Sequence, residues 1–159
     1  LRSAISESVK TVLRRGAKRR RVNVREGGTY VNMEGPAFST KAESNVYRKF
    51  GFDVIGITSL AEAKLCREAE MCYQAIAMVT DYDCWHESEE SVTVEMIIAN
   101  LMANTALARD VIRELIPALG RKKRSCGCGI ALQSAIVTSR DEIPAKVKKA
   151  LKPITGKYL

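Results

Sequence analysis

The chain has 159 residues, of which 46 % are hydrophobic and 28 % are charged; this length and composition are typical of one globular domain and exclude a disordered chain. No apolar run approaches the ~20 residues that a membrane-spanning helix needs, so we expect no membrane partner. The net charge of +8 is concentrated at residues 14–21 and 121–124, for which we expect solvated loops, and without a nucleic-acid-binding motif we expect no specific nucleic-acid partner.

The hydrophobic pattern alternates between the helix period and the strand period along the chain. Helices are predicted over residues 1–14, 40–50, 59–71, 92–116, 130–137 and 143–151. Strands are predicted over residues 29–33, 52–57 and 75–80. The first helix has no features of a signal peptide. Strands that alternate with helices in this way are typical of an α/β layer fold.

Helix ends carry recognisable signals. Two pairs, Thr40 with Glu43 and Ser59 with Glu62, have the capping-box pattern of a hydroxyl residue followed three positions later by glutamate. Pro117 and Gly120 are predicted to end the long helix, because both residues disfavour the helical conformation. The sequence therefore predicts where three of the helices begin or end.

Polar or aromatic residues follow each of the three predicted strands. They are Phe38 after the first strand, Ile57-Thr58-Ser59 after the second, and Asp81-Tyr82-Asp83 after the third. In α/β folds ligands bind beyond the carboxyl ends of the strands, and a hydroxyl at a helix N-terminus suits an oxyanion. Taken singly, these residues also fit a core aromatic, a helix cap and a solvated turn. Their coincidence favours one shared pocket.

The cysteines and the single histidine give weaker signals. Residues 66, 72, 84, 126 and 128 match no zinc pattern, because Cys126-Gly-Cys128 lacks a two-residue spacer and a second ligand pair. We therefore expect no metal site. Cys84 is interpreted as a buried apolar residue, and His86 as a surface residue.

Two runs, MEGPAFSTKAES (33–44) and MVTDYDCWH (78–86), closely resemble 5′-methylthioadenosine phosphorylases of the purine nucleoside phosphorylase superfamily. The similarity extends from about Leu1 through the C-terminal helices. It implies a three-layer α/β/α fold with a mixed central sheet, with residues 1–159 as the C-terminal part of a single domain. The phosphate-binding loop and Arg-His motif of the family's N-terminal half are not found in this sequence.

The resemblance also implies a reaction: cytoplasmic cleavage of 5′-methylthioadenosine by inorganic phosphate to adenine and 5-methylthioribose 1-phosphate, in methionine and purine salvage. Phosphate is a co-substrate, and no cofactor is implied. Two alternatives stay open, a purine nucleoside phosphorylase of broader specificity and a non-catalytic fragment or assembly module. The implied assembly is a homotrimer or hexamer once the N-terminal half is present, in the same chain or as a second chain.

The resemblance assigns roles to the residues of the predicted pocket. By resemblance, Phe38 packs against adenine, Ile57 occupies the ribose-contact position, and Thr58 contacts phosphate. Asp81 faces the purine N7 and amino group, with Tyr82 and Asp83 beside it. Ser39 and Val94 match specificity positions, and Val94 and Ile97 lie beside the methylthio group. As a proton donor Asp81 needs a pKa above the ordinary ~3.9. Burial and a second carboxylate on the same strand face would both raise that pKa.

The Cys126-Gly-Cys128 run is similar to a Cys-X-Cys pair found in some archaeal members of the family, which implies a disulfide there. A bond from Cys66 to Cys126 or Cys128 is the competing pairing. Five free thiols are the third possibility, and the cysteine count does not choose among them.

Overall fold

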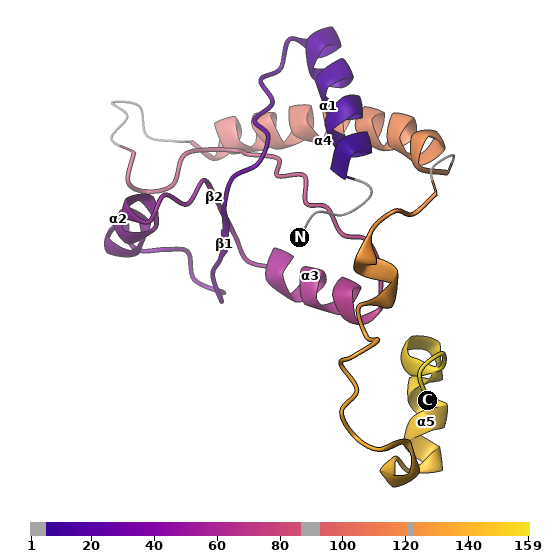
Figure 1. Cartoon of the computed structure of the whole chain (residues 1–159). Coiled ribbons are helices and arrows are strands. Elements are labelled where there is room, and N and C mark those ends of the chain that lie inside the picture. The colour runs from indigo at the N-terminus through magenta and orange to yellow at the C-terminus, as the bar shows by residue number, and fades with distance from the viewer. Residues whose placement is uncertain (1–5, 87–92, 121–122) are drawn as a thin grey trace.

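A computed structural model describes residues 6–86, 93–120 and 123–159 of the protein. Its elements are, in chain order, α1 (Ser6–Arg20), β1 (Tyr30–Asn32), α2 (Lys41–Lys49), β2 (Val54–Gly56), α3 (Ser59–Glu68), α4 (Val94–Gly120), the 3₁₀ helices η1 (Gly127–Ile130) and η2 (Arg140–Glu142), and α5 (Ala145–Thr155). Figure 1 shows α1 lying across α4, the two strands beside α2 and α3, and α5 set apart below α3. Among the described helices, none is long and apolar enough to cross a membrane.

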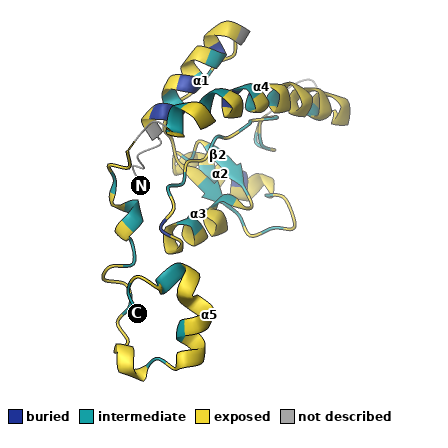
Figure 2. Ribbon diagram, turned by 90° about the vertical axis from the view of Figure 1, so that its right-hand side faces the viewer, coloured by how far each residue is buried: buried dark blue, intermediate teal, exposed yellow. Residues whose placement is uncertain are grey.

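The hydrophobic core lies where α1 crosses α4. Val12 of α1 packs there with Leu107 and Val111 of α4, all less than 9 % exposed, and Figure 2 shows the buried residues at this crossing. Ile76, from the segment between α3 and α4, packs against the same cluster. The core therefore joins the start of the chain to its longest helix and to the segment that leads to Asp81.

The sheet is a parallel pair. Tyr30 lies opposite Val54 and Asn32 opposite Gly56, and α2 makes the crossover that parallel strands require. A Cβ added at Gly56 would lie 1.7 Å from the Tyr30 hydroxyl oxygen, so only glycine lets the Tyr30 ring cross β2 here. The α/β class is confirmed, and the described residues supply two parallel strands of the expected mixed sheet.

The predicted third strand over residues 75–80 is wrong. This segment makes no ladder hydrogen bonds within the described residues, which place no strand next to it. Two of its carbonyls accept instead from α4 side chains: Asn100 Nδ2 lies 2.7 Å from the Thr80 oxygen, and Asn104 Nδ2 lies 2.9 Å from the Val79 oxygen. A strand needs the backbone hydrogen bonds of a partner strand, and the two α4 side chains replace only two of them.

Helix ends differ from the predictions in two places. α1 continues through the basic residues 14–20, which were expected in a loop, because arginine and lysine are good helix formers. Arg14 pairs there with Glu26 (Nη2 to Oε2, 2.9 Å) and Arg19 with Glu114, so part of this charge is neutralised. α4 passes through Pro117 and ends at Gly120, so the first predicted stop is wrong and the second is confirmed. A proline in the last turn removes a single helical hydrogen bond, so the helix tolerates it.

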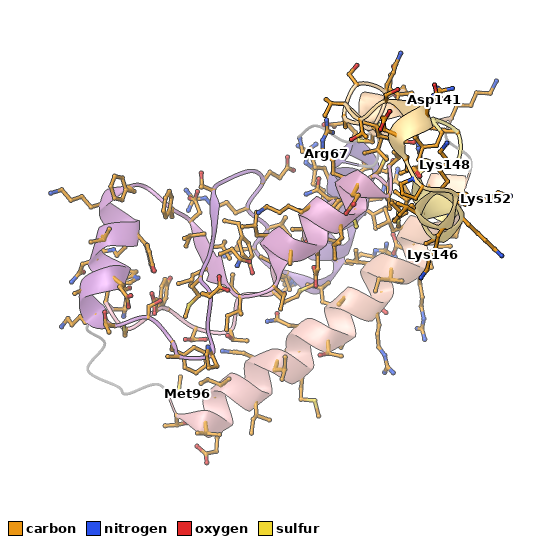
Figure 3. All side chains as sticks on the ribbon, turned by 90° about the horizontal axis from the view of Figure 1, so that it is seen from below. Arg67, Met96, Asp141, Lys146, Lys148 and Lys152 are labelled. Carbon is orange, nitrogen blue, oxygen red and sulfur yellow. The ribbon has the colours of Figure 1, made fainter. Side chains whose placement is uncertain are left out.

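The C-terminal third also departs from the prediction. The helix expected over residues 130–137 is replaced by η1 followed by turns. The last helix, α5, runs from Ala145 to Thr155, beyond the predicted 143–151. Figure 3 shows Met96 at the end of α4 that lies farthest from the labelled lysines of α5.

Candidate functional site

The carboxyl ends of β1 and β2 open into a cleft of about 1040 Å³. Its walls come from the turn after β1, the end of β2, the start of α3 and the segment between α3 and α4. Six of the nine predicted site residues line it: Phe38, Ile57, Thr58, Asp81, Tyr82 and Asp83. The parallel register puts both strand ends at one edge, which explains why residues far apart in sequence meet here.

The start of α3 forms one wall of the cleft. Thr58 is the N-cap residue but makes no side-chain capping hydrogen bond, and the predicted capping box of Ser59 with Glu62 is wrong. Asn32 of β1 takes this role from outside the helix, its Oδ1 accepting from the Leu60 N–H at 3.0 Å. The Ser59 hydroxyl lies 2.9 Å from the Tyr73 hydroxyl instead. The Thr58 hydroxyl is thus placed at a helix N-terminus without serving as a cap.

The other predicted capping box is confirmed. The Thr40 side chain accepts from the Glu43 N–H, and the Glu43 carboxylate accepts from the Thr40 N–H at 2.7 Å. These bonds lower the pKa of Glu43 and fix the start of α2. The turn that carries Phe38 therefore ends at a well-defined point, and the Phe38 ring itself is 86 % exposed in the cleft.

The two aspartates occupy the open side of the cleft. Asp81 is exposed, and its Oδ1 accepts from the Thr80 hydroxyl. Asp83 is half-buried, and its Oδ1 accepts from the Cys84 N–H at 2.8 Å. The expected burial of Asp81 is wrong for the described residues. Because residues 75–80 are not a strand, the argument that both carboxylates share one strand face also fails.

Aromatic residues follow the aspartates. Tyr82 stacks on His86, with ring centroids 4.5 Å apart, and meets Trp85 edge-on at 5.8 Å. The Arg48 guanidinium of α2 lies 3.5 Å from the centroid of the Trp85 ring, a cation–π contact. His86 is exposed as predicted, whereas Cys84 is exposed and its predicted burial is wrong. The contact with Arg48 fixes this end of the segment against α2.

Three predicted residues do not line the cleft. The Ser39 hydroxyl is 3.4 Å from the sulfur of Met33, a cleft residue, but Ser39 itself does not line the cleft. Val94 and Ile97 lie in the first turn of α4, and Val94 is 65 % exposed. Residues 87–92, which lead into that turn, are outside the described part of the chain.

Sequence reasoning missed two tyrosines of the cleft, Tyr30 and Tyr73. Burial raises the pKa of Tyr30, and the nearby Tyr73 and Glu62 raise it further. The Tyr73 hydroxyl donates to Glu62 at 3.1 Å. One sequence feature could have pointed to Tyr30: it is an aromatic residue on a predicted strand, and the next predicted strand contains a glycine that leaves room for its ring. No sequence feature pointed to Tyr73, because its hydrogen-bond partners Ser59 and Glu62 lie in α3, more than ten residues earlier.

None of the five cysteines forms a disulfide, so neither predicted pairing is present in the structure. Cys66 does not join the other predicted partners, whereas the Cys72 and Cys126 sulfurs lie 3.5 Å apart. A hydrogen bond with Cys126, together with burial, raises the pKa of Cys128 to about 11. Cys72, Cys126 and Cys128 thus form one group with the spacing of metal ligands. Spacing along the sequence could not show this group, because 54 residues separate Cys72 from Cys126.

Comparisons with known proteins agree on one family. The profile described as "Phosphorylase superfamily" matches residues 1–117. The chain is 58 % identical over 137 residues to the S-methyl-5′-thioadenosine phosphorylase of Koribacter versatilis and 54 % identical over 136 residues to that of Geobacter sulfurreducens. Each match covers 86 % of this chain and 47 % of the relative. The chain therefore spans about half the length of these curated relatives.

Solved structures give the same result. A methylthioadenosine phosphorylase from an antarctic soil metagenomic library superposes with a TM-score of 0.79 at 37 % identity, covering 93 % of this chain and 53 % of that one. The methylthioadenosine phosphorylase of Schistosoma mansoni in complex with adenine gives 0.66 at 26 % identity, covering 86 % and 54 %. The cleft thus lies in a chain that resembles about half of each of these structures.

Proposed function

The chain belongs to the phosphorylase superfamily, and we propose that it is part of an enzyme that cleaves 5′-methylthioadenosine with phosphate, giving adenine and 5-methylthioribose 1-phosphate. One observation carries the proposal: a single cleft contains Phe38, Thr58 and the Asp81–Asp83 pair. An aromatic face, an oxyanion-binding helix start and a carboxylate are the groups that a purine, a phosphate and a departing base require.

Phe38 and Thr58 are suited to bind the two substrates. The Phe38 ring is 86 % exposed, so one face is available to stack against a purine. The Thr58 hydroxyl stands at the N-terminus of α3, where the helix dipole favours an anion such as phosphate. Ile57 lies between them along the chain and borders the cleft where the sugar would lie.

Asp81 supplies the acid. As the phosphate oxygen forms a bond to C1′ of the sugar, the bond from C1′ to the purine breaks and its electron pair moves onto the base. Protonated Asp81 gives its proton to the purine N7, and its second oxygen accepts a hydrogen bond from the 6-amino group. This role requires that Asp81 be shielded from water, because burial disfavours the charged carboxylate. Asp81 is exposed among the described residues, so the proposal requires cover from beyond them.

An uncovered apolar surface indicates where that cover attaches. α4 exposes Val94, Met102 and Ile116, each at least 65 % exposed, and such a surface is typical of an interface. The chain spans about half of its relatives, so we propose that the missing half covers this surface. A trimer or hexamer of the completed enzyme, in the cytoplasm, is the assembly we propose.

The test is phosphate-dependent release of adenine from methylthioadenosine. The chain alone is expected to be inactive and to sediment as an associated species. Adding the N-terminal half of the Koribacter enzyme as a separate chain should restore a soluble complex and activity that disappears without phosphate. Turnover by the chain alone, or a soluble complex without phosphate-dependent turnover, would contradict the proposal.

A further inference from the structure

Three cysteines from two distant parts of the chain lie together, away from the cleft. Cys72 follows α3, Cys126 precedes η1, and Cys128 lies within η1. Their three sulfur atoms are all within 4.8 Å of one another, and the Cys72 and Cys126 sulfurs are 3.5 Å apart. All three residues are at least partly buried. None of them lines the cleft of Phe38 and Asp81.

The sulfur separations fit a tetrahedral metal ion. Zinc–thiolate bonds of about 2.3 Å at tetrahedral angles place neighbouring sulfurs about 3.8 Å apart. A disulfide would need about 2.05 Å. In this group one sulfur–sulfur distance is 3.5 Å and none is longer than 4.8 Å. These distances lie around the value of about 3.8 Å expected at zinc and are longer than a disulfide bond.

Two cations are fixed on the segments that carry these cysteines. Arg124 Nη1 donates to the Glu70 carbonyl at 3.1 Å, two residues before Cys72. Lys157 Nζ donates to the Gly129 carbonyl at 2.5 Å, next to Cys128. Three thiolates around a divalent ion carry one net negative charge. Lys157 is already paired with the Glu70 carboxylate, so Arg124 is the cation that favours the loaded site.

We propose that Cys72, Cys126 and Cys128 bind one Zn²⁺ ion through three thiolates, with a solvent molecule as the fourth ligand. Three thiols release three protons to solvent as three sulfur–zinc bonds form, and nothing is oxidised. Zinc is suited to this set because thiolates are among its preferred ligands. The ion fastens the segment after α3 to the C-terminal segment, so it stabilises the fold and takes no part in the reaction of the cleft.

The test maps thiol reactivity in the full chain with and without metal. The chelator-treated protein is exposed to iodoacetamide before and after addition of Zn²⁺, and of Cd²⁺ as a second thiophilic probe, and each cysteine is quantified by peptide mass. Metal should slow alkylation of the three site cysteines by about tenfold or more, because a bound thiolate is not free to react. Exposed Cys84 should react at the same rate in both states.

Matched variants extend the test. Cys72→Ser should lower Zn²⁺ affinity, measured against a coloured chelator, by more than the roughly 100-fold typical of outer-shell changes. Cys66→Ser, which removes a partly buried cysteine outside the group, should leave the affinity unchanged. If Cys72→Ser does not fold, the wild-type reactivity map decides alone. Equal protection of all five cysteines, no protection, or a native Cys72–Cys126 disulfide in the peptide map would overturn the proposal.

Discussion

The segment between α3 and α4 is held closely at its first residues and open at Asp81. At the closed end, the Glu70 carboxylate accepts from the Leu132 N–H at 3.0 Å and from the Tyr158 hydroxyl at 2.5 Å, and it also pairs with Lys157. At the open end, Asp81 is exposed and accepts a hydrogen bond from the hydroxyl of the adjacent Thr80. The two carboxylates therefore differ in what surrounds them.

The difference shows what this chain can complete by itself. Glu70 is 9 % exposed, and its partners come from residues 62 and 88 positions along the chain, so the C-terminal segment assembles that site. Asp81 has the residues of a reactive site around it without the shielding that the reaction requires. We infer that the closed end is a structural anchor and that the open end needs cover from beyond the described residues.

The largest expected effect is at the open end. Asp81→Asn in the completed enzyme should lower methylthioadenosine turnover by about 10²–10⁴-fold, the usual contribution of a general acid. Inosine should lose less, because an amide N–H can donate to its O6. The measurement is kcat/KM on both substrates. Asp141→Asn, a charge-matched change in η2, labelled in Figure 3, is the control. Equal losses on both substrates would argue against the role of Asp81.

Phe38→Ala should have a smaller effect on the site than Asp81→Asn, and the effect should appear in adenine affinity. Stacking of a base on an aromatic ring contributes about 1–3 kcal/mol, so adenine affinity should fall by roughly 5- to 150-fold in the completed enzyme. The ring is 86 % exposed, so thermal stability should stay within the range of ordinary surface changes. Phe50→Ala removes another exposed phenylalanine that does not line the cleft, and it should leave adenine affinity unchanged. A loss of stability in place of affinity would show that Phe38 belongs to the fold.

The same contrast separates what the sequence could and could not predict. The Thr40–Glu43 cap and the two strands were predictable, because the cap depends on two residues three positions apart and each strand on a short run with β-branched residues. The strand over residues 75–80 was not, because a strand also needs a neighbouring strand, and the described residues place none beside this segment. Asp81 and Phe38 were singled out because each follows a predicted strand, and the family resemblance gave them roles; the structure places both in one cleft.

Hydrogen bonds between residues far apart in the sequence could not be predicted. Tyr158 lies 88 residues after Glu70, and no periodicity links them. Glu70 has a positive φ of 55°, which is unusual for a residue other than glycine. It stands just after the end of α3, where this backbone conformation turns the chain and directs the Glu70 side chain toward its hydrogen-bond partners. Composition alone would have placed this glutamate on the surface.

At the closed end, Glu70→Gln should loosen the C-terminal segment and spare the reaction. The amide keeps the size of the side chain and removes the charge that Lys157 pairs with. Hydrogen exchange of residues 130–159 should become about tenfold faster, because this segment depends on Glu70 for its attachment. Glu68→Gln, at the exposed end of α3, is the matched control and should change nothing. Adenine release that falls as far as in Asp81→Asn would mean that the two ends are coupled.

The smallest expected effect is the pH dependence of that attachment. Burial raises the pKa of Glu70, but hydrogen bonds from Lys157, Tyr158 and the Leu132 N–H outweigh it and lower the pKa to about 2. A carboxyl whose folded pKa lies below its ordinary value of about 4.3 stabilises the fold above that ordinary value, and this contribution is lost as pH falls toward the folded pKa. Exchange of residues 145–159, corrected for intrinsic rates, should therefore be constant from pH 7 to about 5 and rise between about pH 4 and 2. Glu70→Gln should be looser throughout and lack this rise, because its side chain does not titrate. Loosening that begins above pH 5, or an equal rise in the variant, would assign the acid sensitivity to other carboxylates and remove Glu70 as the anchor.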